Sequence, residues 1–247
     1  MNLIIDIGNT RVKLGFFDGS HFLKKEIFLK KDFTLDVLLE IERKHTITHR
    51  ILTNSGELQG EILEFLSEKK NFILLSAETP LPIVNKYATP KTLGKDRLAG
   101  AVAATVLFPN QNCLTIDCGT CITYNFINKS GEFLGGNISL GIKMRLEAMH
   151  HFTAKLPLVE QGDIENLLGN DTKSALQTGA QLGAIHEMEG FIEAYIQRFG
   201  NVRTLLTGGD ADYFAIHLKN KIFALENLVL IGLNAILIFN RNAKYIK

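Results

Sequence analysis

Short apolar runs bounded by turn residues dominate the first third of the chain, and amphipathic stretches lie between the later runs. Runs of β-branched and aromatic residues that end in Gly, Asn or Asp are typical of strands, whereas apolar residues spaced three and four apart are typical of helices. The pattern predicts, in order, three strands, a helix, a strand, a helix and a strand, over residues 2–7, 11–17, 21–29, 36–43, 50–54, 57–68 and 72–75.

A polar segment at residues 77–95 follows, and it carries three of the five prolines, which predicts a loop. After it, a helix is expected and the strand pattern starts again. The predicted elements are a helix, three strands, two helices, a strand and a helix, over residues 96–107, 113–117, 121–128, 132–139, 141–151, 171–199, 204–206 and 228–240. Apolar positions of the long helix over 171–199 cover more than one narrow stripe, which predicts a second packing partner for it.

The first strand–turn–strand stretch recurs halfway along the chain. Residues 2–16 read NLIIDIGNTRVKLGF and residues 113–127 read CLTIDCGTCITYNFI, so that Asp6 aligns with Asp117 and the glycine two positions later aligns as well. One such loop is compatible with an ordinary hairpin turn. Two copies, each opening one half of the chain, favour a duplicated fold that clamps a nucleotide.

The order of elements indicates the fold class. Three strands followed by alternating helices and strands is the order of a ribonuclease H-like half-domain, and both halves of the chain have it. We therefore expect an α/β protein with duplicated ribonuclease H-like domains, residues 1–110 and residues 111–247, and with the nucleotide cleft between them.

Charge and hydropathy disfavour some classes of protein. The chain of 247 residues has 27 basic and 26 acidic residues, which disfavours a protein that binds nucleic acid through its phosphates. The longest apolar run, residues 228–239, is interrupted by Gly232 and Asn234, so no membrane span is expected. The N-terminus leads directly into a strand that contains Asp6, so we expect no signal peptide and a cytoplasmic protein.

The three cysteines, Cys113, Cys118 and Cys121, have a spacing that superficially matches part of an iron–sulfur motif. Such a cluster needs a fourth cysteine, and the sequence has none. Because all three fall in or beside predicted strands, they are better interpreted as small buried apolar residues.

Two loops have the chemistry of a phosphate site. Residues 6–13, here called the Asp6 loop, offer backbone N–H groups, a hydroxyl, an amide and two cations, with a carboxylate placed to hold Mg²⁺. The sequence lacks a Walker motif and a dinucleotide fingerprint in context, which disfavours a Rossmann dehydrogenase. Residues 117–121, the Asp117 loop, repeat the pattern. Asp117 as a turn cap, and a two-metal nuclease with Asp6 and Asp117, are the alternatives, and the charge balance does not support the second.

The most distinctive stretch is residues 87–97, here called the Asp96 segment, which reads YATPKTLGKDR. A carboxylate beside an arginine at a helix start stays ionised and can accept a hydroxyl proton, which makes Asp96 a candidate base. Arg97 is a candidate for binding a substrate carboxylate or phosphate. The alternative is a helix-capping Asp followed by a surface Arg. Paired glycines at residues 208–209 would let a ring or ribose approach the backbone, but they are common at strand–helix junctions.

Together these motifs resemble the type III pantothenate kinases, within the acetate and sugar kinase, Hsp70 and actin superfamily, and the resemblance covers nearly the whole chain. The fold it implies is the actin-like ATPase fold. The motifs are D-x-G-N-T-x-x-K at 6–13, Y-x-x-P at 87–90, L-G-x-D-R at 93–97, D-x-G-T at 117–120, G-G-x-I-x-x-G at 135–141, a threonine at 172 and T-G-G at 207–209. The L-G-x-D-R motif combined with both loops is specific to this family.

The resemblance implies ATP-dependent phosphorylation of pantothenate, the first step to coenzyme A, by a homodimer. It implies that Asp96 is the general base and that Asp117 holds a monovalent cation, K⁺ or NH₄⁺. The residues implied to bind ATP and Mg²⁺ are Asp6, Ile7, Gly8, Asn9, Thr10, Arg11, Val12 and Lys13, with Thr120 also touching ATP. The residues implied to bind pantothenate are Tyr87, Gly94, Lys95, Asp96 and Arg97, with Thr172 contributed by the partner subunit or a neighbouring helix.

The chain departs from the family pattern at three positions, with Cys121 for alanine, Asn125 for an acidic residue and Leu140 for proline. Proline would have fixed the backbone at residue 140, so Leu140 is expected to loosen this loop. Two other functions stay open, namely another small-molecule kinase of the superfamily and a non-catalytic transcriptional accessory factor on this fold.

Overall fold

The computed structural model describes residues 1–54, 60–164 and 166–243. By its internal contacts the chain forms two compact units. The first unit contains Met1–Asn110, Ile127–Gly135 and Asn227–Lys247, and the second contains Gln111–Phe126 and Gly136–Glu226. None of the helices within the described ranges is long and apolar enough to cross a membrane.

The first unit is built on a five-stranded sheet of order β3-β2-β1-β4-β5. Its strands are β1 Asn2–Ile7, β2 Arg11–Asp18, β3 His21–Leu29, β4 His49–Asn54 and β5 Phe72–Leu74. The first three strands pair antiparallel, β4 pairs in parallel with β1, and β5 pairs in parallel with β4. All five strands predicted from the apolar runs are confirmed.

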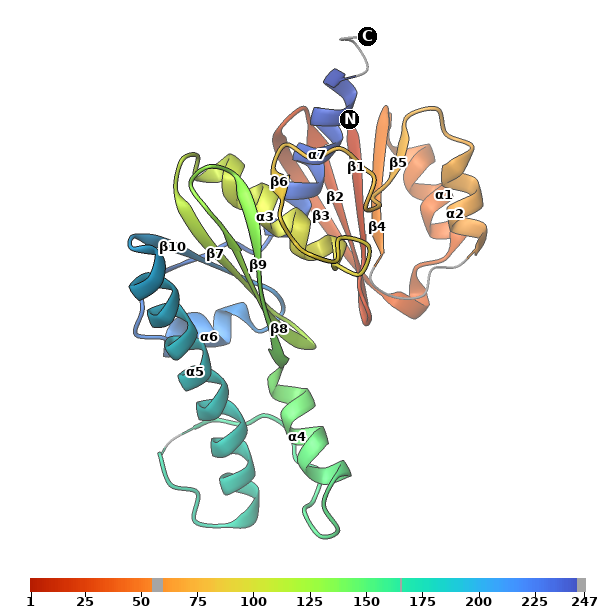
Figure 1. The fold of residues 1–247 in the computed structure, drawn as a ribbon. Coiled ribbons are helices and arrows are strands. Elements are labelled where there is room, and N and C mark those ends of the chain that lie inside the picture. Colours follow the sequence, from red (N-terminus) through yellow and green to blue (C-terminus); the bar gives the residue numbers. More distant parts are fainter. Residues whose placement is uncertain (55–59, 165, 244–247) are drawn as a thin grey trace. The chain divides into compact units, whose positions relative to one another are not determined.

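Helices cover both faces of this sheet (Figure 1). On one face, Leu38 and Ile41 of α1 (Leu35–Lys44) and Ile62 and Leu66 of α2 (Gly60–Ser67) share a buried cluster with alternate residues of β1 and β2. The other face is covered by α3 (Lys95–Leu107) and α7 (Leu228–Ala243), which pack together and contact β4. The predicted helix over 57–68 is confirmed from Gly60 onward, and its first three residues lie outside the described part of the chain.

Helices α3 and α7 approach each other closely because small residues line their contact. Ala99, Gly100 and Ala101 of α3 are buried. A Cβ added at Gly232 of α7 would lie well inside van der Waals contact with the carbonyl oxygen and carbon of Ala99. The alanines and glycine of α3 therefore serve close packing.

The second sheet has six strands in the order β11-β10-β7-β8-β9-β6. Its strands are β6 Val84–Asn85, β7 Asn112–Cys118, β8 Cys121–Ile127, β9 Glu132–Leu140, β10 Val202–Thr207 and β11 Ile222–Ala224. Strand β10 lies parallel to β7, as β4 lies parallel to β1 in the first sheet. This correspondence agrees with the sequence repeat.

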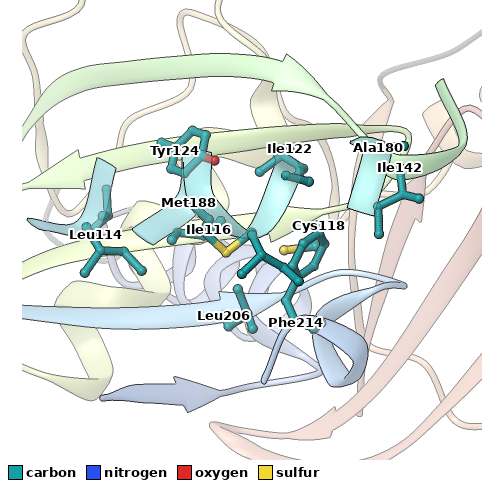
Figure 2. Packing of buried hydrophobic residues seen from close by; sticks show 14 of the residues in the cluster. Leu114, Ile116, Cys118, Ile122, Tyr124, Ile142, Ala180, Met188, Leu206 and Phe214 are labelled. Carbon is teal, nitrogen blue, oxygen red and sulfur yellow. The ribbon is translucent and has the colours of Figure 1, made fainter. Parts of the chain in front are cut away.

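The core of the second unit joins this sheet to its helices. Cys118 and Ile116 of β7, Met188 of α5 (Thr172–Phe199) and Phe214 of α6 (Ala211–His217) pack in one cluster (Figure 2). Helix α4 (Ile142–His151) packs along α5. The predicted helices over 141–151 and 171–199 are confirmed.

The apolar positions of α5 predicted a second packing partner, but the structure accounts for most of them without one. Leu176, Ile185, Met188 and Ile192 are all buried within the same chain, so most of its apolar positions need no second partner. Large apolar side chains are instead exposed on β9 and in the segment between α4 and α5. They are Leu134, Ile138, Leu140, Phe152, Leu158, Leu167 and Leu168.

Short elements of the second sheet were not predicted. They are the strands β6 and β11, and the short helix α6 beside that sheet was not predicted either, since each element is too short to give a clear period. The domain boundary between residues 110 and 111 stays a prediction. What the contacts show is that α7, near the end of the chain, packs with α3, β1 and β4 of the first unit.

We expect Gly232→Ala to destabilise the protein by about 1–3 kcal/mol, because the added methyl group overpacks the α3–α7 contact. The matched control is Gly190→Ala on α5, where nothing lies within 4 Å of the added Cβ. That control should leave stability unchanged or raise it by up to about 1 kcal/mol. Chemical denaturation measures both, and equal midpoints for the two variants would contradict the prediction.

Candidate active site

The Asp6 loop forms the tight hairpin between β1 and β2. The Gly8 amide donates to the Arg11 carbonyl oxygen (3.0 Å), and the Lys30 amide donates to the Thr10 carbonyl oxygen (3.0 Å). Asn9, Thr10 and Arg11 are exposed at the turn. The hairpin thus presents an amide, a hydroxyl and a cation to solvent, as a phosphate site requires.

Strand alternation separates the residues of this loop into two groups. Ile7 and Val12 belong to the buried cluster against α1 and α2, so only their backbone can serve a ligand. Asp6 lies opposite Lys13 in the β1–β2 register and points to the other face of the sheet. Asp6 is 8% exposed, a depth at which a carboxylate needs compensating partners.

The Asp6 side chain shares its sheet face with α7. Gly15 is paired with Ile4, two residues before Asp6, and a Cβ at Gly15 would lie 3.3 Å from Leu230 Cδ1 of α7. Thr53, paired with Asp6 on β4, is 1% exposed. The structure therefore places Asp6 on the sheet face that α3 and α7 cover, and α3 is the helix that carries Asp96.

Asp96 lies in the first turn of α3, whose N-cap is Gly94. Its Oδ1 accepts a hydrogen bond from the Arg97 amide (2.8 Å). A Cβ at Gly94 would lie only 2.6 Å from this Oδ1, so the glycine makes room for the carboxylate. The alternative in which Asp96 is the helix-capping residue is wrong. The first-turn position still gives its charge a favourable interaction with the helix dipole.

Arg97 is buried, at 6% exposure, which also excludes the alternative of a surface arginine. Its guanidinium carbon lies 5.6 Å from the centre of the Tyr87 ring. That ring also packs against Phe133, and a Cβ at Gly135 would lie 3.3 Å from it. The structure thus brings Tyr87 and Arg97 together, as the family resemblance implied, and gives Gly135 a role in seating the tyrosine.

Other residues of the Asp96 segment hold the segment itself. The Lys95 ammonium donates to the carbonyl oxygens of Leu93 (3.0 Å) and Pro90 (3.3 Å). The Thr92 hydroxyl donates to the Thr89 carbonyl oxygen (3.1 Å). Lys95 therefore contributes to the shape of the loop in this conformation.

The Asp117 loop joins β7 to β8 in the second unit. The Gly119 amide donates to the Cys121 carbonyl oxygen (3.0 Å), which resembles the Gly8–Arg11 bond of the Asp6 loop but closes a turn that is one residue shorter. The Gly141 amide donates to the Thr120 carbonyl oxygen (3.1 Å), so the motif at 135–141 ends against this turn. Thr120 is exposed and Asp117 is half-buried.

The paired glycines at 208–209 lie beside Asp117. Gly208 has φ +103°, and a Cβ there would lie 2.5 Å from Asp117 Oδ1. The Asp210 amide donates to the Cys118 carbonyl oxygen (3.0 Å). The carboxylates of Asp117 and Asp210 both act on Cys118, whose pKa is raised by burial first and by these two charges second. Asp210 is a site candidate that the sequence reasoning missed, although it directly follows the T-G-G motif.

Thr172 is the first residue of α5 and is exposed. Asp171 caps this helix, accepting from the Ser174 amide (3.0 Å) and from the Ser174 hydroxyl (3.0 Å). These bonds, led by the one from the Ser174 amide, hold the pKa of Asp171 below its usual range. Thr172 therefore stands at a well-formed helix start.

In the described ranges no three His, Cys, Asp or Glu side chains form a metal-binding group. Cys113 and Cys118 are buried free thiols, which confirms their interpretation as core residues, whereas Cys121 is only half-buried. Mg²⁺ needs only one or two carboxylates when phosphates and water complete its shell, and a buried strand-end carboxylate such as Asp6 fits that donor set.

Solved structures of similar fold define the class of this protein. One from Campylobacter jejuni, described as a candidate transcriptional activator of the Baf family, has a TM-score of 0.61 at 23% identity and covers 97% of this chain and 99% of its own. A glucokinase from an Antarctic psychrotroph has a TM-score of 0.55 at 14% identity and covers 97% and 98%. The predicted actin-like ATPase and sugar kinase fold is thereby confirmed.

Sequence comparison defines the family. A family model described as type III pantothenate kinase matches residues 2–194. The type III pantothenate kinase of Bacteroides fragilis (strain ATCC 25285) is 42% identical over 241 residues, 97% of this chain and 98% of the relative. That of Flavobacterium johnsoniae is 39% identical over 234 residues, 95% and 96%. The chain belongs to the type III pantothenate kinase family.

We expect iodoacetamide at pH 8 to label Cys121 well before Cys113 and Cys118. Burial raises the pKa of Cys113 to about 11 and raises that of Cys118 still further, so little thiolate forms at either. Mass spectrometry of tryptic peptides gives the labelling order, and the urea-unfolded protein, in which all three label at similar rates, is the control. Rapid labelling of Cys118 in the native protein would contradict the packing described.

Proposed function

We propose that this protein transfers the γ-phosphoryl group of ATP to the hydroxyl group of pantothenate, giving 4′-phosphopantothenate in the first step of coenzyme A synthesis. The full-length match to type III pantothenate kinases at about 40% identity is the observation that carries the proposal. The arrangement of Gly94, Asp96 and Arg97 supports the proposal. Gly94 leaves room for the Asp96 carboxylate, and the next residue, Arg97, is buried.

Asp96 is the proposed general base. Its Oδ1 is oriented by the Arg97 amide, which leaves Oδ2 as the oxygen that accepts the hydroxyl proton of pantothenate. Tyr87 and Arg97 form one side of the acceptor site, with Gly94 and Lys95 shaping the loop. Arg97 suits the pantothenate carboxylate, since a buried guanidinium binds a carboxylate through two parallel hydrogen bonds.

Both loops are proposed to bind phosphate, each with the residues of its own unit. Asp6, Asn9, Thr10, Arg11 and Lys13 offer side chains to the phosphates and to Mg²⁺, whereas Ile7, Gly8 and Val12 offer backbone only. Mg²⁺ would neutralise charge on the transferred phosphoryl group. Thr120 contacts ATP from the Asp117 loop, and Asp117 holds K⁺ or NH₄⁺.

The expected location of the protein in the cytoplasm stays a prediction.

We further propose a homodimer in which Thr172 of one subunit contributes to the pantothenate site of the other. Its support is the group of large apolar side chains exposed around the α4–α5 connection, among them Phe152 (81%), Leu158 (59%) and Leu168 (81%). An exposed apolar patch usually marks a contact with another protein when its side chains are contiguous. A second copy of the chain is the occupant that the family resemblance implies.

The proposed activity is tested by ADP release in the presence of pantothenate, with Mg²⁺ and with K⁺ or Na⁺. We expect turnover that needs pantothenate and rises when K⁺ or NH₄⁺ replaces Na⁺, because a cation beside Asp117 would screen the triphosphate. Asp117→Ala should remove this rise. ADP release with a sugar but not with pantothenate would assign the protein to another kinase of the fold, and a rise that survives in Asp117→Ala would move the cation site elsewhere.

Asp96→Asn should lower kcat by about 10²-fold or more, because the amide keeps the size of the side chain but cannot take the proton. ATP affinity should change little. Steady-state kinetics and nucleotide titration measure the two quantities. The control is Asp36→Asn in the first turn of α1, which should leave both unchanged. Near-normal turnover in Asp96→Asn would remove Asp96 from the mechanism.

Light scattering after size exclusion should give twice the chain mass of 27.5 kDa. Replacing Phe152 and Leu168 by serine should shift the protein toward monomer and lower activity at low enzyme concentration, because Thr172 would then lose its place at the partner's site. Replacing the exposed Ile216 (79%) of α6 by serine is the matched control. A fully active monomer would rule out the shared site.

A further inference from the structure

Glu187 of α5 is the centre of a side-chain network in the second unit. Its Oε1 accepts from the Tyr124 hydroxyl (3.2 Å), and its Oε2 accepts from the Ser139 hydroxyl (3.0 Å) and from Arg145 Nη2 (2.5 Å). These partners come from β8, β9 and α4. One carboxylate thus ties a helix to two neighbouring strands and to a second helix.

The network reaches the backbone before α4. Arg145 Nε donates to the Leu140 carbonyl oxygen (2.9 Å), and its Nη2 also donates to the Ser139 hydroxyl (3.2 Å). Arg145 therefore holds residues 139 and 140 by both side chain and main chain. The Arg145 guanidinium is suited to this, because its planar fork donates in several fixed directions, which a lysine cannot do.

The held backbone leads directly to the Asp117 loop. The residue after Leu140 is Gly141, whose amide donates to the Thr120 carbonyl oxygen (3.1 Å). A Cβ at Gly141 would lie 2.6 Å from that oxygen, so the two segments touch through their backbones. A shift of residues 139–141 would consequently move the turn that carries Thr120.

The network is buried enough to act as a rigid support. The Arg145 and Glu187 side chains are 18% and 27% exposed, and Tyr124 is fully buried. Burial, and then the Glu187 charge, raise the pKa of Tyr124, so its hydroxyl stays a donor at every working pH. A charged pair held by neutral donors in partial burial is stronger than an exposed pair.

We propose that Glu187 is a positioning residue for phosphoryl transfer, which acts through Arg145 and Ser139 to fix the backbone of residues 139–141 and hence the Thr120 turn. The inference rests on the proposed function, in which that turn contacts ATP. It also bears on Leu140, because Arg145 holds the Leu140 carbonyl group at a position where proline would have fixed the backbone angle.

The test compares Glu187→Gln and Arg145→Lys with the wild type. Both variants should raise KM for ATP and the K⁺ concentration needed for half-activation by about tenfold, the effect of losing one charge-assisted hydrogen bond. KM for pantothenate should change less than about twofold, since the Asp96 segment is untouched. Ser139→Ala, which removes one hydroxyl and no charge, should give an intermediate rise.

The matched control is Glu42→Gln, which breaks the ion pair of Glu42 with Arg50 in the first unit, where the side chains are 14% and 9% exposed. It should lower the unfolding midpoint as much as Glu187→Gln does, but leave KM for ATP unchanged. Equal kinetics in the two variants would overturn the positioning role. If Glu187→Gln does not fold, the KM for ATP and the K⁺ concentration for half-activation are measured in Ser139→Ala and Tyr124→Phe instead. Wild-type values in both of these variants would overturn the positioning role.

Calorimetric titration of ATP separates this inference from the proposed function. A wild-type protein without pantothenate-dependent ADP release would overturn the proposed function alone. The positioning role would still predict weaker ATP binding by Glu187→Gln than by Glu42→Gln. Unchanged ATP affinity in Glu187→Gln would overturn the positioning role, whatever the acceptor substrate is.

Discussion

The geometry of the Asp117 loop depends on backbone segments that touch it more closely than a Cβ atom would allow. Gly141 and Gly208 reach it from distant positions in the chain, the first at the Thr120 carbonyl oxygen and the second at the Asp117 carboxylate. Backbone segments in such close contact have little room to move, because any added atom would have to displace main-chain atoms. The loop is consequently held by the elements around it and cannot adjust independently. Phosphoryl transfer needs such restraint, since catalysis rests mainly on the alignment of charges around the transferred group.

The Asp6 loop and the Asp117 loop are similar hairpins, but different contacts hold each of them in place. The Asp6 loop is a hairpin whose strands lie in the middle of a sheet, and its own residues Ile7 and Val12 anchor it in a buried cluster. The Asp117 loop has a similar hairpin bond but relies in addition on glycines and on the network around Glu187. The repeated sequence therefore forms a similar turn twice, in different surroundings. The rigidity of the second copy comes from side chains outside the repeated motif.

Much of the fold could be predicted because its strands are short apolar runs with turn residues at their ends, a local signal. The position of α7 could not, because a strongly apolar helix packs equally well on any open sheet face, and only three-dimensional contacts select one. At the site, the motifs identified Asp96 and its neighbours, yet the need for Gly94 beside the carboxylate is visible only in coordinates. Glu187 gave no signal at all, since a single glutamate in a long helix looks like part of a solvated face. Its partners lie 42 to 63 residues away along the chain.

The packing of α7 also constrains how the molecule is made. Asn234 accepts a hydrogen bond from Asn2 (2.9 Å) across 232 positions of sequence, and its own amide reaches the Gly19 carbonyl oxygen (2.9 Å). The first sheet leaves the ribosome early and α3 follows it, but α7 can complete the cover of the second face only after the segments of the second unit have been made. Contacts this far apart close slowly, because the loop between them must first be ordered. During synthesis the second unit can therefore fold before the cover of the first sheet is complete.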